Sequence, residues 1–266
     1  MKERTTYPSD ITREQFEAIR PKLEGFRRVT KPRILDLYDI FCAILYVLKS
    51  GCQWRMLPKD YPPFHTVYTY FRQWGAKPFA DQPSLLENLL REQVVAARLA
   101  DGRTEKTSLL IADAQSVKNT DTAEEKGYDA GKKVSGIKRH IAVDTNGFPH
   151  SIAITTANVT DRQGALLALS CSPEDVSEVK MVLVDSGYTG EPFAQGVATI
   201  IPNAVVEVVK RNELHSFVVL PKRWIVERSF GWLEKCRRLW KNCERLLNNS
   251  LQMVDLAFLY LLLKRL

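Results

Sequence analysis

The chain has 266 residues, of which 45% are hydrophobic and 26% are charged, and its formal net charge at pH 7 is +7. This composition is that of a globular protein, and it excludes a collagen-like, low-complexity or disordered chain. The length allows one large domain or two smaller ones. The positive charge favours a polyanionic partner.

The first hundred residues are expected to be helical. Apolar residues recur there at helical spacing in four segments, separated by proline and glycine, which cover residues 11–20, 34–49, 66–74 and 84–99. Short helices joined by tight turns suit a helix-turn-helix module, in which residues 66–74 are offered to DNA with Arg72 toward the phosphates. A helical domain that mediates dimerisation is an equally fair interpretation of residues 1–103.

From about residue 104 the pattern changes to strands and then to alternating strands and helices. The expected strands cover residues 108–112, 137–143, 150–156, 181–184 and 206–209, with a hairpin turn at residues 145–147. One helix should begin near Thr160 or Asp161, and another should lie around residues 191–196. Helical spacing from Val226 to Leu247 predicts a long amphipathic helix. Residues 104–266 are therefore predicted to form an α/β domain.

Three carboxylates stand out by their settings. Asp113 and Asp185 each follow a short apolar run that is typical of a buried strand, whereas Glu227 lies on a helix rich in arginine. A carboxylate at the end of an apolar strand is costly to bury unless a partner compensates its charge, and a cation is a natural partner. Taken singly, each aspartate is equally well explained as a turn or helix-capping residue, and Glu227 as the partner of Arg223 in a surface ion pair.

Taken together, the three carboxylates predict a magnesium site. Mg²⁺ prefers oxygen ligands and is usually held by one or two carboxylates, waters and substrate phosphates. Two such ions about 3.5–4 Å apart can stabilise both the attacking and the leaving oxygen of a phosphoryl displacement. Three carboxylates can hold two Mg²⁺ ions, or Mn²⁺ as a substitute, and still leave positions open for a substrate.

Basic residues flank these carboxylates along the chain. A charge run often only solvates a surface, but its position on both sides of a metal-type carboxylate cluster favours contacts with DNA phosphates. With Arg72, the residues predicted to make such contacts are Lys132, Lys133, Lys138, Arg139, Arg223, Arg228, Arg237 and Arg238.

Several ordered blocks of the sequence resemble bacterial insertion-sequence transposases of the DDE type, in the insertion-sequence-five branch. The blocks are IADAQSVKNT, GIKRHIAVDTNGFP, ITTANVTDRQGA, VLVDSGYTG and RWIVERSFGWLEKCRRL. The stretch ILYVLKSGCQWRMLPKDYPPFHTVYTYFRQW resembles the leader domain of the same enzymes. The resemblance spans nearly the whole chain.

The resemblance implies that Asp113, Asp185 and Glu227 form the acidic triad of an RNase H-like core, a mixed sheet flanked by helices that follows an all-helical N-terminal domain. It also implies that the two aspartates lie on adjacent central strands. The wider superfamily often has Tyr, Arg, Glu and Lys at fixed spacing around the glutamate. Leu220 and Glu234 depart from this pattern at the tyrosine and lysine positions, and Lys235 is offset by one.

The activity that the resemblance implies is cleavage of DNA at insertion-sequence ends and transfer of the freed 3′-hydroxyl into target DNA. Alternatives are an RNase H-like nuclease that does not join strands and a DNA-binding regulator that has lost the chemistry. The expected partners are double-stranded DNA, as inverted-repeat ends and as target, and a second copy of the chain or more. We expect a cytoplasmic protein, because the start shows no signal segment and the apolar run at residues 251–266 is too short to span a bilayer.

Overall fold

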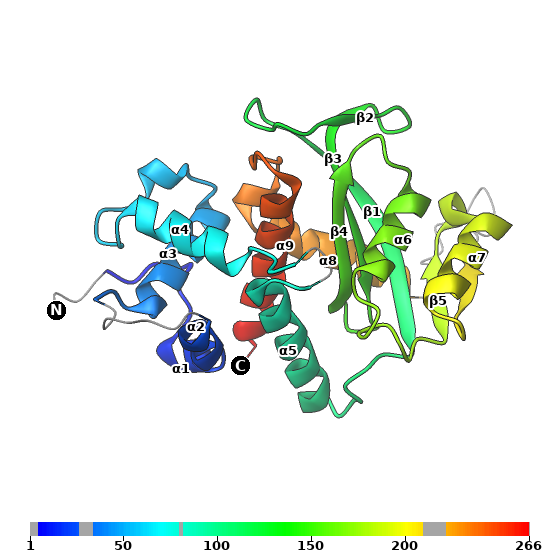
Figure 1. The fold of residues 1–266 in the computed structure, drawn as a ribbon, viewed down its shortest axis with the longest axis horizontal. Helices are drawn as coiled ribbons and strands as arrows, with labels where there is room; N and C mark the ends of the chain where they lie inside the picture. The colour runs from blue at the N-terminus through cyan, green and yellow to red at the C-terminus, as the bar shows by residue number, and fades with distance from the viewer. Residues whose placement is uncertain (1–4, 27–33, 80–81, 210–221, 266) are drawn as a thin grey trace. The chain divides into compact units, whose positions relative to one another are not determined.

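The computed structural model describes residues 5–26, 34–79, 82–209 and 222–265 (Figure 1). The chain forms two compact units. The first comprises Met1–Gln93, Leu233–Trp240 and Gln252–Leu266, and the second comprises Val94–Trp232 and Lys241–Leu251. The C-terminal part of the chain therefore contributes to both units. The functional division at residue 103, into a DNA-end-binding or dimerising part and a catalytic part, stays a prediction.

The N-terminal region is helical, as predicted. Its elements are α1 (Arg13–Glu17), α2 (Arg20–Gly25), α3 (Leu37–Ser50), η1 (Trp54–Met56), α4 (Phe64–Trp74) and α5 (Leu85–Ala100). Helix α1 begins with a capping box, in which Thr12 and Gln15 each accept from the other's backbone amide. Helix α3 ends at Gly51, whose φ of 73° is the left-handed conformation that glycine adopts without strain.

Helix α3 is the centre of the first unit. Most of its side chains are buried, as expected for a helix that is covered on several sides. The later segment η3 (Arg237–Leu239) packs against it. The Lys49 ammonium donates to the Lys235 carbonyl at 2.8 Å, and Arg238 Nη1 donates to the Cys52 carbonyl at 3.2 Å. These bonds fasten a C-terminal segment to the N-terminal helices.

The prediction of one long helix from residue 226 to 247 is wrong. Helix α8 (Trp224–Glu234) ends well before that point, and η3 and an extended segment separate it from α9 (Leu247–Leu263). The physical reason is a competing set of backbone hydrogen bonds. Asn242 N donates to the Lys118 carbonyl at 2.9 Å, and Thr120 N donates to the Asn242 carbonyl at 2.9 Å. In the ranges given above, no helix has the length and apolar character needed to cross a membrane.

The second unit contains a mixed sheet. The order β2-β3-β1-β5-β6 runs across it, and β4 also pairs with β3. Strands β2, β3, β1 and β4 pair antiparallel, whereas β1, β5 and β6 pair parallel. The strands are β1 (Leu109–Lys118), β2 (Gly127–Asp129), β3 (Val134–Val143), β4 (Pro149–Thr156), β5 (Met181–Val184) and β6 (Val205–Val208).

This topology confirms the mixed α/β prediction and has the strand order expected of an RNase H-like core. Four antiparallel strands, β1 to β4, come first, and two parallel strands follow through helical connections, β5 beside β1 and β6 beside β5. The sequence did not predict β2, because its three residues, Gly127–Asp129, carry no apolar alternation.

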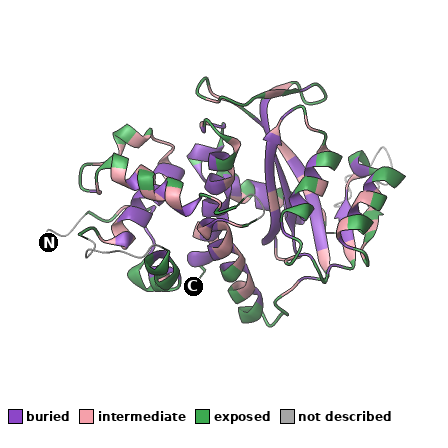
Figure 2. Ribbon diagram, viewed as in Figure 1, coloured by how far each residue is buried: buried purple, intermediate pink, exposed green. Residues whose placement is uncertain are grey.

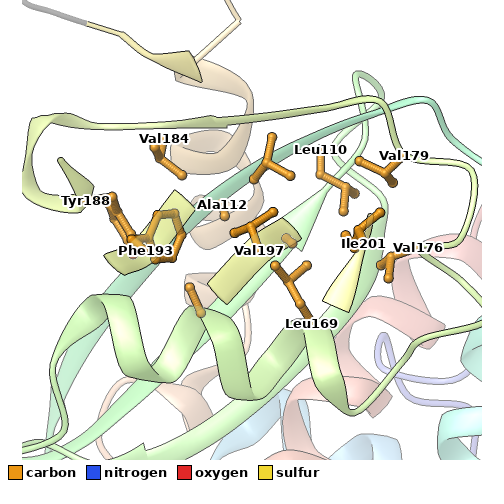
Figure 3. Close-up of a cluster of buried hydrophobic side chains, with 13 residues drawn as sticks. Leu110, Ala112, Leu169, Val176, Val179, Val184, Tyr188, Phe193, Val197 and Ile201 are labelled. Atoms are coloured by element: carbon orange, nitrogen blue, oxygen red, sulfur yellow. The ribbon is translucent and has the colours of Figure 1, made fainter. Parts of the chain in front are cut away.

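Helices α6 (Asp161–Ser170) and α7 (Glu191–Ile200) cover the sheet and bury its main apolar cluster. Helix α6 lies along β3, β4 and β1, and α7 packs against β6 (Figure 1). Figure 3 shows side chains from β1, β5, α6 and α7 meeting in this cluster, with the Tyr188 and Phe193 rings side by side. Gly164 allows the close approach of α6, because a Cβ there would lie 2.0 Å from the His140 ring.

A buried ion pair fixes the turn between β3 and β4. Asp144 is fully buried and accepts hydrogen bonds from Arg98, from His150 Nε2 and from the amides of Asn146 and Phe148. Arg98 is also buried and donates to the carbonyls of residues 104–106, the segment that leads into β1. Figure 2 shows that burial extends through the central strands. One guanidinium thus ties the start of β1 to the far end of β3.

We predict that Asp144→Asn destabilises the protein by about 3–5 kcal/mol, because it leaves the Arg98 charge buried without its counterion. Burial acts to raise the pKa of Asp144, but the bonds from His150 and Arg98 outweigh it and hold this pKa below its ordinary value. The stabilisation is therefore present above the pKa of the unfolded state and is lost as the pH falls through the folded pKa. Denaturant unfolding at pH 7 measures the change.

The matched control is Asp101→Asn. Asp101 is exposed and its carboxylate accepts a hydrogen bond from the Asn146 side chain at 2.7 Å, so its replacement should change the stability by less than about 0.5 kcal/mol. Equal stability of the Asp144→Asn variant and the wild type would contradict a structural role for this ion pair.

Candidate active site

The pairing of β1 with β5 brings two of the predicted carboxylates side by side. The parallel register matches Leu109 with Met181 and Ile111 with Leu183. Continued by two residues, the same register sets Asp113 opposite Asp185. Asp113 lies inside β1, which extends to Lys118, so the prediction that it ends a strand is wrong. Asp185 does follow the last residue of β5, Val184.

Asp113 lies in an environment that disfavours its charge. Its neighbour Ala112 packs into the cluster beneath α6, so strand alternation directs Asp113 to the opposite face of the sheet. Burial raises the pKa of Asp113 to about 6, and the negative charge of Asp185 acts in the same direction. The Ala114 amide, which donates to Asp113 Oδ1 at 2.8 Å, and the cations Arg223 and Lys132 oppose this shift. A cation between the two aspartates would be strongly stabilised.

Arg223 connects Asp185 to Glu227. Its Nη2 atom lies 3.2 Å from Asp185 Oδ2, and its Nε atom lies 3.6 Å from Glu227 Oε1, one helical turn along α8. Glu227 is the most exposed of the three carboxylates, with 60% of its side chain accessible. Within the described ranges no three acidic, histidine or cysteine side chains converge closely enough to hold a metal ion. The structure thus brings the aspartates together and links Glu227 to them through the guanidinium.

Asp185 also shapes the loop that follows it. Its Oδ1 atom accepts from the Gly187 amide at 2.8 Å and caps the short helix η2 (Ser186–Tyr188). The Tyr188 hydroxyl is buried and has no hydrogen-bond partner in the described part of the chain. Burial raises the pKa of Tyr188, and the charge of Asp113 adds to this shift. Sequence reasoning missed Tyr188, although the string VLVDSGYTG places it three residues after the aspartate.

Helix α8 is docked on the turn between β3 and β4. Arg228 Nη2 donates to the Asn146 carbonyl at 2.9 Å, and Ser229 Oγ donates to the Gly147 carbonyl at 2.9 Å. The Arg228 guanidinium lies 4.6 Å from the centre of the Trp224 ring and 4.9 Å from that of Trp232. These contacts fix the helix that carries Glu227. The spacing of four residues between the tryptophans and Arg228 was the sequence signal for this stack.

A left-handed glycine makes this docking possible. Gly147 has a φ of 83°, and a Cβ at this position would lie 2.7 Å from Ser229 Oγ and 2.9 Å from the Trp232 ring. Both the backbone conformation and the lack of space therefore require glycine here.

The basic residues predicted to contact DNA are placed very differently from one another. Lys138 and Arg139 are buried in β3, and Arg238 is buried in the first unit. Lys138 lies 3.2 Å from Asp129 Oδ2 and 2.8 Å from Asp161 Oδ1, and Arg139 Nη1 donates to Gln115 at 3.1 Å. Such burial favours a structural role for these charges, and their contact with DNA stays a prediction.

Other basic residues keep their side chains accessible. Arg228 is partly buried in its tryptophan stack, as is Arg223 between its carboxylates. Exposed residues of the predicted set are Arg72, Lys132, Lys133 and Arg237. Their contacts with DNA also stay predictions. Leu220, the departure from the superfamily pattern at the tyrosine position, lies outside the described residues.

Comparison with known proteins assigns both parts of the chain. Residues 104–262 match the family described as "Transposase DDE domain", and residues 11–82 match the family described as "Putative transposase of IS4/5 family". A curated relative from Burkholderia cepacia, "Putative transposase for insertion sequence element IS402", is 31% identical over 117 residues. That alignment covers 41% of this chain and 54% of the relative, so it spans about half of the relative's length.

The matched DDE domain spans the complete sheet, both aspartates and the helix that carries Glu227. The strand order, the adjacent aspartates and the glutamate helix agree with the RNase H-like core that such a domain has. Enzymes with this domain typically use divalent metal ions. The chain belongs to the DDE transposase family, in its IS4/5 group.

Proposed function

We propose that this protein is a DNA transposase that cuts DNA at the ends of its insertion sequence and joins the freed 3′-hydroxyl to target DNA. The observation that carries the proposal is the parallel β1–β5 register within the matched domain, which, continued two residues past Ile111 and Leu183, brings Asp113 opposite Asp185. Carboxylates so close together repel each other unless a cation lies between them. Metal-assisted phosphoryl transfer needs such a cation.

The residues present fit divalent metal ions of the Mg²⁺ or Mn²⁺ type. Asp113, Asp185 and Glu227 offer only oxygen atoms, and Asp113 lies where its charge is poorly compensated. When bound, two such ions supply stabilisation of the attacking and leaving oxygens of a phosphodiester. Asp113 and Asp185 would hold the ions from the sheet, and Glu227 would hold one of them from α8. No side chain needs to form a covalent bond with DNA.

Basic side chains of the second unit would position the DNA backbone, and the exposed Lys132 and Lys133 lie on the same hairpin. Arg72 at the end of α4 would serve a DNA-end-binding N-terminal region. Coordinated joining requires two element ends to be held together, so the active form on DNA would be at least a dimer. The substrate would be double-stranded DNA, and the location that we propose is accordingly the cytoplasm.

Joined products distinguish this proposal from the two alternatives. A labelled duplex that carries the inverted repeat flanking the reading frame is incubated with the protein, Mg²⁺ and a target plasmid. A transposase yields label covalently joined to the plasmid. Cutting without joining would instead support an RNase H-like nuclease, and binding without cutting would support a regulator.

We predict that Asp113→Asn, Asp185→Asn and Glu227→Gln each lower the rate of end cleavage by at least about 10³-fold, because each removes a charged metal ligand. DNA binding should persist in a gel-shift assay, since no basic residue is changed. The matched control is Glu191→Gln, an exposed carboxylate in the first turn of α7, which should cleave like the wild type. Cleavage by Asp113→Asn at the wild-type rate would remove Asp113 from the mechanism.

We further predict that Arg223→Gln raises the affinity of the DNA-free protein for Mn²⁺ by about tenfold. The guanidinium bonds to oxygens of Asp185 and Glu227 that a metal ion would need, and its charge repels a second cation. Titration calorimetry or the electron paramagnetic resonance signal of free Mn²⁺ measures the affinity. Arg223→Lys keeps the charge and should stay near the wild type. Weaker Mn²⁺ binding by Arg223→Gln would show that Arg223 does not compete with the metal.

A further inference from the structure

The hairpin that joins β2 to β3 has a conformation fixed by buried groups. Asp129 Oδ1 accepts from the Lys132 amide at 3.0 Å, and Asp129 Oδ2 accepts from Ser116 Oγ at 2.7 Å. Lys133 has a φ of 54°, a left-handed conformation that is uncommon for a residue other than glycine. The surrounding bonds therefore hold the turn in one strained shape, and strain of this kind often accompanies a functional position.

This turn carries the Lys132 ammonium to the strand that bears Asp113. Lys132 Nζ donates to the Ala114 carbonyl at 3.2 Å, one residue beyond Asp113. Strand β5 ends at Val184, and β1 pairs with it only up to Ile111, so the Ala114 carbonyl lies beyond this pairing. Lys132 therefore lies beside the edge of β1, next to the aspartate pair. Its charge also acts on Asp113, as noted above.

The ammonium of Lys132 can bind a further ligand. Lys138, which is buried, lies 2.8 Å from Asp161 Oδ1 and forms an ion pair with that carboxylate. Lys132 lies 3.6 Å from the other oxygen of Asp161, beyond ordinary hydrogen-bond length, and 46% of its side chain is exposed. A lysine has three N–H donors, and the described residues provide an acceptor at hydrogen-bond distance for one of them.

We propose that Lys132 binds a phosphate of the DNA strand being cut, immediately beside the reacting phosphodiester, and that Asp129, Asp161 and Lys138 hold it in place for this contact. The inference rests on the proposed function, because it assumes that DNA is cut at the aspartate pair. Within the basic segment of residues 132–139, Lys132 would contact the substrate and the buried Lys138 would support it. A fixed cation at the reaction centre stabilises developing negative charge without rearrangement.

The test compares Lys132→Gln with the wild type in single-turnover cleavage of the inverted-repeat duplex at saturating DNA. We expect the cleavage rate to fall at least about tenfold, while the dissociation constant for DNA changes less than about threefold. Lys132→Arg should recover most of the rate. Lys180→Gln, an equal loss of charge at an exposed residue before β5, should change neither quantity. Thermal unfolding checks that Lys132→Gln is folded, as expected for an exposed ion pair.

A second readout locates the contact on the DNA. Neutral methylphosphonates are placed one at a time at the phosphates that flank the cleavage site. At one position the methylphosphonate should lower the cleavage rate of the wild type to that of Lys132→Gln. The same methylphosphonate should not lower the rate of Lys132→Gln any further. A rate for Lys132→Gln equal to the wild type, or a defect that is additive with every methylphosphonate, overturns the inference alone. Failure of the wild type to cut any duplex overturns the proposed function as well.

Discussion

The parallel pairing of β1 with β5 is the constraint on which the candidate site depends. Continued two residues past Ile111 and Leu183, its register brings Asp113 opposite Asp185, and the charge of Asp185 acts on Asp113. Folding therefore places two negative charges near each other, and the apolar cluster on the other face contains no group that could compensate them. The free energy of burying that cluster, at about 25 cal/mol per Å² of apolar surface, is what makes the electrostatic cost tolerable.

Groups around the aspartates compensate this negative charge from two sides. Arg223 neutralises it from the residue that precedes α8, and the Ala114 amide and Lys132 reduce it from the sheet and the hairpin. Helix α8 can act in this way only because the turn at Asn146 and Gly147 receives Arg228 and Ser229. Asp144, which is paired with Arg98, holds this turn in place. A chain of local contacts thus leads from a buried ion pair to the position of Glu227.

Much of the fold follows from local patterns in the sequence. Apolar runs before Asp113 and Asp185 predicted β1 and β5, and the Asn-Gly turn predicted the β3–β4 hairpin, because burial and turn chemistry act over a few residues. The break after Glu234 was not predictable, since it depends on backbone bonds between Asn242 and a strand more than a hundred residues earlier. The burial of Lys138 was missed for a similar reason. Its carboxylate partners, Asp129 and Asp161, come from other elements, whereas a basic run alone suggests a solvated surface.

The contribution of the C-terminal helix to the first unit has a consequence for how the protein is made. Gln252 of α9 donates to the Gly75 carbonyl at 2.8 Å, and the Tyr260 ring lies 5.1 Å from the Lys49 ammonium. The N-terminal helices therefore lack these contacts until the ribosome has released residues 252–263. A nascent polypeptide must keep α3 from aggregating during that interval, and a frameshift upstream of α9 would leave both compact units incomplete.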